Sequence, residues 1–154
     1  KKKGATDFGE MFGEMIGESM REQAAEAKAK IMKELRSPTI EGEQERLANI
    51  DRTMEQLTNQ AQLTEAEQAY LRDVLNREDL KRREAIGAIL NSGRDPTYDE
   101  VSKIIDDSYK SQDSQVATSL STEKFATYER QQRMERRFVG VFVKMMFQEP
   151  PEGE

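Results

Sequence analysis

The side chains of this chain that could do chemistry are carboxylates, guanidinium groups and thioethers, because the sequence contains neither His nor Cys. Without imidazole or thiolate, ordinary Zn²⁺ and Cu(II) sites, cysteine-dependent catalysis and Ser-His-Asp triads are excluded. A di-iron bundle of the Glu-x-x-His type is excluded for the same reason. Carboxylate sites for Ca²⁺ or Mg²⁺ remain open, but no EF-hand spacing or phosphate-binding glycine loop is present. We therefore expect no metal and no cofactor.

Carboxylates are the most plentiful of these groups, and several of them stand at or near expected helix starts. The candidates are Glu67, Asp73, Asp99, Glu100, Asp106 and Asp107. Nothing in their spacing places two of them around a substrate pocket, and acids in a first helical turn already stabilise the helix dipole. We expect that this protein is not an enzyme.

Thioethers are concentrated near the N-terminus, where Met11, Met15 and Met20 could offer soft ligands to Cu(I). The same spacing is typical of a deformable apolar surface. We favour the surface and keep the copper site as the alternative.

The stretch FGEMFGEMIGESM combines an apolar helical stripe with three glycines at four-residue intervals. The stripe is Phe8, Met11, Phe12, Met15 and Ile16, and the glycines are Gly9, Gly13 and Gly17. Each glycine costs a helix interior about 0.5–1 kcal/mol relative to Ala, so three of them call for a reason. Either they form a groove that another helix approaches closely, which we favour, or the terminus is loose. The interspersed glutamates exclude a buried membrane span.

The C-terminal part carries a basic cluster followed by an apolar run. The arginines are Arg130, Arg133, Arg136 and Arg137, and the apolar residues are Phe138, Val141, Phe142 and Met145. Glu129 and Glu135 stand beside the arginines, so a solvated face with ion pairs is favoured over a grip on an acidic partner or phosphate. The apolar residues either complete the core against the first helix or remain an exposed interaction patch. We favour the core, within one chain or across a dimer.

The composition favours long exposed helices as the elements that carry these groups. Charged residues make up 35% of the chain and hydrophobic residues another 35%, with no Trp and a mean hydropathy of -0.89. A chain of 154 residues with this profile fits one elongated bundle. The net charge of -6 argues against general nucleic-acid binding. No apolar run approaches the ~20 residues of a membrane span.

Local signals divide the chain into five helices, each of the last four preceded by a capping residue. The caps are Ser37 before Pro38, Thr64 paired with Glu67, Thr97 paired with Glu100, and Ser121. Gly93 is suited to end the third helix. We expect an all-α fold, built as antiparallel helical hairpins or an elongated bundle of about five helices. Residues 1–148 form one domain, in which the N-terminal helix at 1–36 can be semi-independent, and residues 149–154 form a disordered tail.

Hydrophobic spacing indicates which parts of these helices pack. The second helix carries a coiled-coil-like seam of Ile40, Leu47, Ile50, Met54, Leu57 and Ala61. In the third helix only Leu80 is apolar between Asn76 and Glu84, which predicts exposure or a short break. The polar stretch at residues 110–119 predicts a frayed end of the fourth helix.

Two short motifs carry a resemblance to a known family. LTEAE at residues 63–67 and LSTEK at 120–124 each precede a helix and resemble the paired Leu-Thr-x-x-Gln motifs of the Spy-like periplasmic helical chaperones and metal-stress proteins. The resemblance covers residues 58–137, with Glu67 and Lys124 in place of the motif glutamine. It implies a thin helical cradle, often dimeric, that holds unfolded clients without ATP in the periplasm.

Together these features predict a non-enzymatic interaction protein that binds a protein partner or client on its Met- and Phe-rich helical surface. The leading hypothesis is an ATP-independent, chaperone-like homodimer in the periplasm. The alternative is a cytosolic or membrane-associated adaptor or scaffold with one specific partner. The chain starts at Lys1 rather than Met, which indicates a processed product, a trimmed form or a domain of a longer protein.

Overall fold

The protein is a set of five helices, described by a computed structural model over residues 2–147, with side chains described for residues 18, 19 and 21–147. The helices are α1 (Lys2–Arg36), α2 (Ile40–Ala61), α3 (Glu65–Asn91), α4 (Tyr98–Ala117) and α5 (Thr122–Phe147). The described part of the chain contains no strand. The prediction of an all-α fold of about five helices is therefore confirmed.

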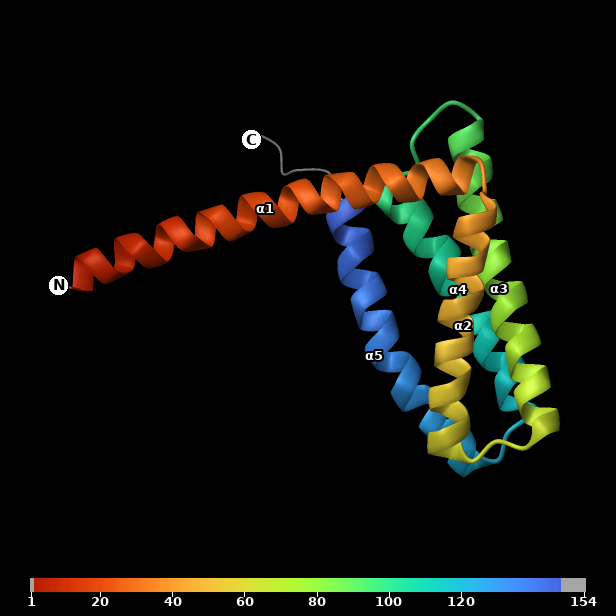
Figure 1. Cartoon of the computed structure of the whole chain (residues 1–154). Coiled ribbons are helices and arrows are strands. Elements are labelled where there is room, and N and C mark those ends of the chain that lie inside the picture. Colours follow the sequence, from red (N-terminus) through yellow and green to blue (C-terminus); the bar gives the residue numbers. More distant parts are fainter. Residues whose placement is uncertain (1, 148–154) are drawn as a thin grey trace.

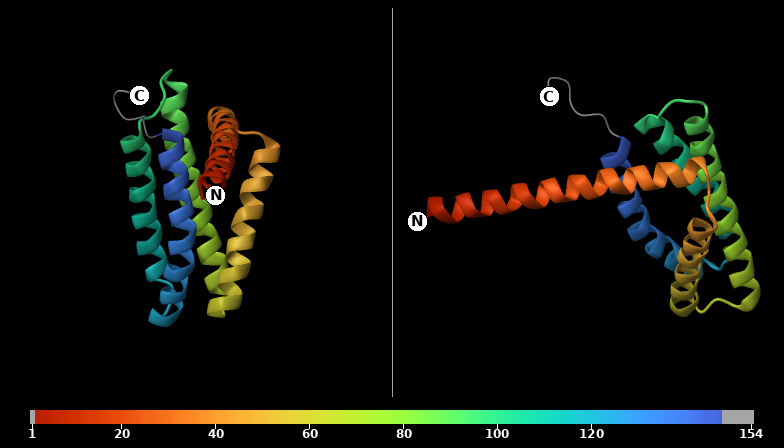
Figure 2. Two further views of the ribbon diagram at one scale, coloured as in Figure 1. Left: turned by 90° about the vertical axis from the view of Figure 1, so that its left-hand side faces the viewer. Right: turned by 45° about the horizontal axis from the view of Figure 1, so that its top comes forward.

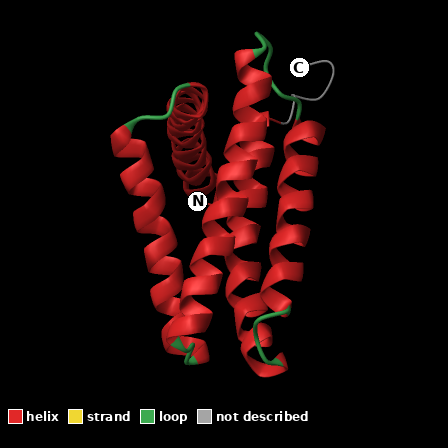
Figure 3. Ribbon diagram, turned by 90° about the vertical axis from the view of Figure 1, so that its right-hand side faces the viewer, coloured by secondary structure: helices red, strands yellow, loops and turns green. Residues whose placement is uncertain are grey.

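Helices α2 to α5 form an antiparallel bundle closed into a ring. Helix α3 packs between α2 and α4, and α5 packs between α4 and α2. Helix α1 runs across one end of this bundle, where it contacts α3 and α5, and its N-terminal half continues beyond the other helices (Figures 1 and 2). Viewed from the right-hand side of Figure 1, the four bundle helices stand alongside one another with α1 seen almost end-on (Figure 3).

Three of the four predicted caps are present. The Thr64 and Thr97 hydroxyls each accept a hydrogen bond from the backbone amide three residues on, and the paired glutamates accept the cap amides in return. The Ser121 hydroxyl accepts from the amide of Lys124 at 3.2 Å. Gly93 adopts a φ of 95° just after α3, as expected for a helix end.

The predicted cap at Ser37 is wrong, because α2 is capped by Thr39. The Thr39 hydroxyl accepts from the Gly42 amide at 3.0 Å. The Glu34 carboxylate at the end of α1 accepts from the Thr39 amide at 2.8 Å and from its hydroxyl at 2.7 Å. A side chain five residues upstream thus joins α1 to α2. A Cβ on Gly42 would lie 2.1 Å from this carboxylate, so a larger residue there would displace the Glu34 side chain from its contacts with Thr39.

The bundle has two hydrophobic clusters, one at each end. The cluster far from α1 comprises Met54, Leu57, Leu63, Leu71, Val74, Leu75, Val116 and Tyr128. The cluster beneath α1 comprises Met32, Ile86, Leu90, Val101, Val143, Met146 and Phe147. Helix α1 is therefore part of the core through its C-terminal third.

A close backbone approach fixes α1 on α3. A Cβ added to Gly87 would lie 2.6 Å from the carbonyl oxygen of Leu35, which is closer than real Cβ contacts come. Met32 is buried at the same end, and the Lys28 ammonium lies 5.6 Å from the centre of the Phe147 ring. The crossing of α1 over α3 thus depends on a residue without a side chain.

Between the two clusters lies a set of buried hydrogen-bonding residues, which we call the polar waist. Its buried members are Glu78, Ser108, Gln112 and Gln132. Glu78 accepts hydrogen bonds from the hydroxyls of Ser108 and Ser111 at 3.1 and 3.2 Å. The amide of Gln112 donates to Gln132 at 3.2 Å. These contacts satisfy polar groups that would otherwise be costly to bury.

The polar waist corrects two predictions. Helix α3 is continuous through the stretch expected to be exposed or broken, and Glu78 in its middle is 1% exposed. Helix α4 is ordered through the stretch expected to fray, with Gln112 and Val116 buried. The prediction of a coiled-coil-like seam along α2 is also only partly correct, because Ile40 and Leu47 are exposed whereas Met54 and Leu57 are buried.

Candidate functional site

The outer face of α5 carries an exposed apolar stripe, which we call the outer stripe. It consists of Met134, Phe138, Val141 and Met145, with 66%, 74%, 55% and 48% of each residue exposed. Intervals of four, three and four residues put these side chains on one helical face. Single exposed apolar residues are common on proteins, but a continuous row on one helix is typical of an interaction surface.

The inward face of α5 determines where the outer stripe points. Tyr128 and Gln132 are buried near the polar waist, and Val143, Met146 and Phe147 are buried beneath α1. Because these residues anchor one side of the helix at both ends, residues about half a turn away must face outward. The outer stripe is therefore held on a fixed helix rather than on a loop.

A shallow groove of about 560 Å³ runs between α2 and α5 beside this stripe. Met134 and Phe138 line its α5 side, and Asn49, Arg52, Thr53, Gln56 and Gln60 line its α2 side. The side-chain amide of Gln131 donates to the Thr53 carbonyl at 3.5 Å and to the Gln56 side chain at 3.4 Å, so it joins the two walls. The outer stripe thus borders a groove with polar walls on the α2 side.

Positive charge lies along one side of the outer stripe, and we call this row the basic edge. It consists of the exposed residues Arg130, Arg133, Arg137 and Lys144. Among the residues whose side chains are described, no carboxylate lies within ion-pair distance of Arg133 or Arg137. Arg136 is different, because both its terminal nitrogens donate to Asp113, at 2.8 and 2.6 Å, and its guanidinium lies 4.1 Å from the Tyr109 ring centre. The predicted arginine cluster is thus divided between the surface and the bundle interior.

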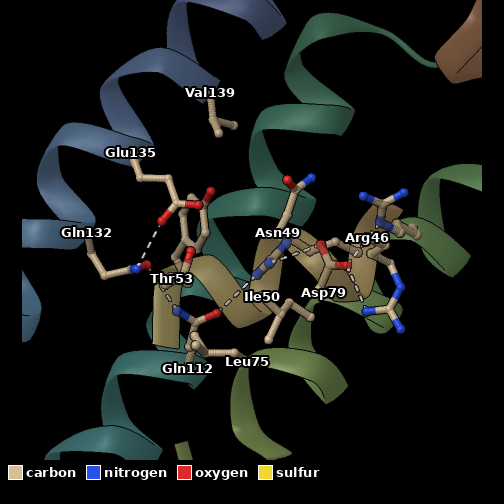
Figure 4. Close-up of a pocket in the computed structure, with 13 residues that line it drawn as sticks. Arg46, Asn49, Ile50, Thr53, Leu75, Asp79, Gln112, Gln132, Glu135 and Val139 are labelled. Atoms are coloured by element: carbon tan, nitrogen blue, oxygen red, sulfur yellow. Dashed lines mark hydrogen bonds and ion pairs between the residues drawn. The ribbon is translucent and has the colours of Figure 1, made fainter. Parts of the chain in front are cut away.

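A second concavity, of about 290 Å³, opens at the polar waist (Figure 4). Asp79 lies at one side of it and accepts hydrogen bonds from Arg46, Arg82 and Arg83 at 3.1, 3.5 and 3.0 Å. Arg46 is also held by both oxygens of Glu43, at 2.9 and 2.6 Å. Because two carboxylates already bind these guanidinium groups, they stabilise the fold and do not await an anionic ligand.

The candidate carboxylates do not converge on a site. Glu67 and Glu100 serve in capping boxes, Asp73 binds Arg77, and Asp107 binds Lys103. Asp99 and Asp106 are exposed. Within the described part of the chain, no three His, Cys, Asp or Glu residues lie close enough to hold a metal ion.

Several carboxyl groups have lowered pKa values, and structural contacts are the cause. Both terminal nitrogens of Arg94 donate to Glu100, at 2.7 and 2.6 Å, and with the Thr97 amide they lower the pKa of Glu100 to about 2. The Lys124 ammonium and then the Thr64 amide hold the pKa of Glu67 below its ordinary value. Burial raises the pKa of Glu78, but hydrogen bonds from Ser108 and Gln115 bring it below the ordinary value. A general acid needs the opposite shift.

The predicted interface residues fall into two groups. The N-terminal members Phe8, Gly9, Met11, Phe12, Gly13, Met15, Ile16 and Gly17 are part of α1, but their side chains lie outside the described residues. So does the side chain of Met20, the third methionine of the copper alternative. Of the C-terminal members, Phe138, Val141 and Met145 are exposed, which contradicts the core interpretation within one chain, while Phe142 packs beside the cluster under α1.

Sequence reasoning missed Met134 and the polar waist. Met134 continues the four-three-four spacing of the outer stripe. That spacing differs from the row of Val143 and Met146, which are buried, and Val139, which is partly buried. The signal for the waist is that Ser108 and Gln112 occupy the packing face of α4 between Val101 and Val116.

No helix in the described part of the chain is long and apolar enough to cross a membrane. Comparison of the chain with protein-family models, with curated protein sequences and with solved structures gave no significant match.

Proposed function

We propose that this chain is a non-enzymatic protein-interaction module that binds apolar segments of other polypeptides along the outer face of α5. The observation that carries the proposal is the exposure of four consecutive stripe positions on a helix whose other face is buried. Burying apolar side chains yields about 25 cal/mol per Å², so such a row provides a substantial driving force for association.

The chemistry of the surface supports a binder of varied sequences. Two of the four stripe residues are methionines, whose flexible, polarizable side chains adapt to different partners. The basic edge beside them favours segments that also carry acidic residues and speeds their encounter. These properties support the chaperone-like version, in which unfolded clients are held without ATP, as the Spy-like resemblance implies.

The chaperone-like version is tested by diluting an unrelated, chemically unfolded protein into buffer with the full chain and following light scattering. We expect near-stoichiometric suppression of aggregation, and loss of most of this suppression in the double variant Met134→Asp/Phe138→Asp. Ile40→Asp is the control, because Ile40 is 76% exposed at the start of α2 and belongs neither to the stripe nor to the lining of the groove beside it. Aggregation that proceeds unhindered with the unmodified chain would contradict this version.

The adaptor version is favoured by the shape of the surface, because a single row on one helix suits one amphipathic partner helix. It predicts one saturable partner whose binding is lost in the same double variant and kept in Ile40→Asp. Clients of unrelated sequence then compete poorly with that partner. Equal competition by many unrelated clients would favour the chaperone-like version instead.

A further inference from the structure

The N-terminal half of α1 has the composition that the outer face of α5 would accept. We propose that the outer stripe and basic edge bind residues 8–22 of a second copy of this chain, with the two helices antiparallel. This inference rests on the proposed function, since it takes the outer face of α5 as a docking surface and names its partner.

The geometry of α1 favours a second copy over the chain's own α5. Helix α1 is continuous over Lys2–Arg36, and its last turns are fixed by buried Met32 and by the contact of Leu35 with Gly87. Its ribbon passes the C-terminal end of α5 and extends away from the bundle (Figures 1 and 2). At 1.5 Å per residue, Glu18 lies about 21 Å from Met32 along the helix. A continuous helix cannot fold back from there onto its own stripe.

Charge complementarity identifies the segment. The basic edge on α5 has an acidic counterpart in α1, where Glu10, Glu14, Glu18 and Glu22 recur at four-residue intervals beside the sequence stripe of Phe8, Met11, Phe12, Met15 and Ile16. Glu18 and Glu22, the two whose side chains are described, are exposed. Each segment thus combines an apolar row with one charged row, and the two charges are opposite.

The helical spacing also selects the direction. At about 100° per residue, the charged row lies on the same side of the apolar row in both segments when each is viewed from its own N-terminus. Facing helices bring such rows together only when they run antiparallel. With Phe12 placed opposite Val141, Glu18 falls near Arg137, Glu22 near Arg133, and Glu10 near Lys144.

The contact can form twice in one dimer. A two-fold axis that turns α1 onto the reversed direction of α5 also turns α5 onto the reversed direction of α1. The result is an isologous dimer in which each chain supplies one segment and one surface.

The test is a charge exchange in the full chain, followed by light scattering coupled to size exclusion. The unmodified chain is expected to be dimeric.

Glu18→Arg/Glu22→Arg and Arg133→Glu/Arg137→Glu are each expected to weaken the dimer at least 10-fold. An equimolar mixture of the two is expected to form a heterodimer, because both contacts then pair opposite charges, and the quadruple variant is expected to recover the homodimer. Glu55→Arg/Glu84→Arg, which changes the same charge at exposed sites elsewhere, should leave the mass unchanged.

Disulfide trapping tests the direction, since the chain has no cysteine of its own. Glu18→Cys/Arg137→Cys is expected to yield a covalent dimer on mild oxidation. Glu18→Cys/Lys144→Cys is not, because the antiparallel register separates these positions by about nine residues along the helix, whereas a parallel register would place them at nearly the same level. A monomeric unmodified chain, a mixture that stays monomeric or preferential trapping of the second pair would overturn the inference. In those cases, client suppression that still depends on Phe138 would leave the proposed function standing. If the charge-exchanged variants pair as expected but the chain binds no client, α5 is a self-association surface only, and the proposed function is contradicted.

Discussion

At the scale of single residues, the bundle depends on polar groups that are buried together. Tyr128 is 1% exposed, and its hydroxyl donates to Asp113 at 2.8 Å and accepts from Gln112 at 2.9 Å. Burial raises the pKa of Tyr128, so it remains a neutral donor. This hydroxyl links the far hydrophobic cluster to the polar waist, because its ring belongs to the first and its oxygen to the second.

Removing that hydroxyl should destabilise the protein. Tyr128→Phe removes one buried hydrogen bond to Gln112 and one to the Asp113 carboxylate, although Gln112 still donates to Gln132 and Asp113 still accepts from Arg136. Because one of the two lost bonds is to a charged group, we expect a loss of about 1–3 kcal/mol in the free energy of unfolding. Tyr70→Phe is the matched control, because the Tyr70 hydroxyl donates to the Gln115 carbonyl at 3.3 Å from a more exposed position. Urea titrations followed by circular dichroism give both values. Equal losses would show that the buried hydroxyl has no special role.

The Arg94–Glu100 pair predicts a pH dependence. With a folded pKa of about 2 against an ordinary 4.5, Glu100 binds fewer protons when folded, so it stabilises the fold above pH 4.5. That contribution is lost as pH falls from 4.5 toward 2. Arg94→Ala should raise the pKa of Glu100 toward its ordinary value, measured by carboxyl NMR titration. Lys103→Ala, which removes the partner of Asp107, should leave the pKa of Glu100 unchanged.

At the scale of helices, the docking of α1 depends on Gly87. Gly87→Ala would place a methyl group 2.6 Å from the Leu35 carbonyl oxygen, so we expect a loss of about 1–3 kcal/mol as α1 shifts or strains. Gly140→Ala is the control, because a Cβ there meets nothing within 4 Å and Ala is the better helix former. It should gain up to about 1 kcal/mol. Thermal unfolding compares the two, and a gain at Gly87 would contradict the close crossing.

The helices themselves were largely predictable, because their signals are local. Capping boxes at Thr64 and Thr97 bring residues three apart into contact, and hydrophobic spacing placed Met54, Leu57 and Val101 inward. The cap at Thr39 was missed because Ser37 before Pro38 gives a competing local signal, and the contacts that hold Thr39 in place come from Glu34 of the preceding helix. The buried middle of α3 was missed because Glu78 is satisfied by α4, and no pattern within α3 shows that.

The candidate surface was less predictable than the fold. The sequence marked Phe138, Val141 and Met145 as apolar, but burial depends on which face of α5 its neighbours occupy. The row of Val143, Met146 and Phe147 occupies that inner face instead. Nothing local to α5 shows which of the two apolar rows is buried, since both have helical spacing.

At the scale of the whole molecule, α1 belongs to the bundle only in part, and backbone hydrogen exchange should reveal this. We expect slow exchange for residues 28–36, which pack on α3 and α5, and faster exchange for residues 18–24 at low protein concentration. If a second copy covers the N-terminal half of α1, the backbone amides of residues 18–24 should become protected from exchange as the protein concentration rises. Uniformly slow exchange along α1 at every concentration would contradict a division of this helix.

The Glu34–Thr39 junction fixes only the C-terminal end of α1, so the angle of the helix at this end determines where its N-terminal end lies. Phe8 and Met32 are 24 residues apart in α1, so at 1.5 Å per residue the arm from the docking point at Met32 to Phe8 is about 36 Å long. A tilt of about 10° at the short end would swing the far end of that arm by roughly 6 Å, about the spacing of one helical turn. The two hydrogen bonds that Glu34 accepts from Thr39 lie near the point about which α1 would tilt. A small change in the angle of α1 there would therefore produce a large displacement of its N-terminal end.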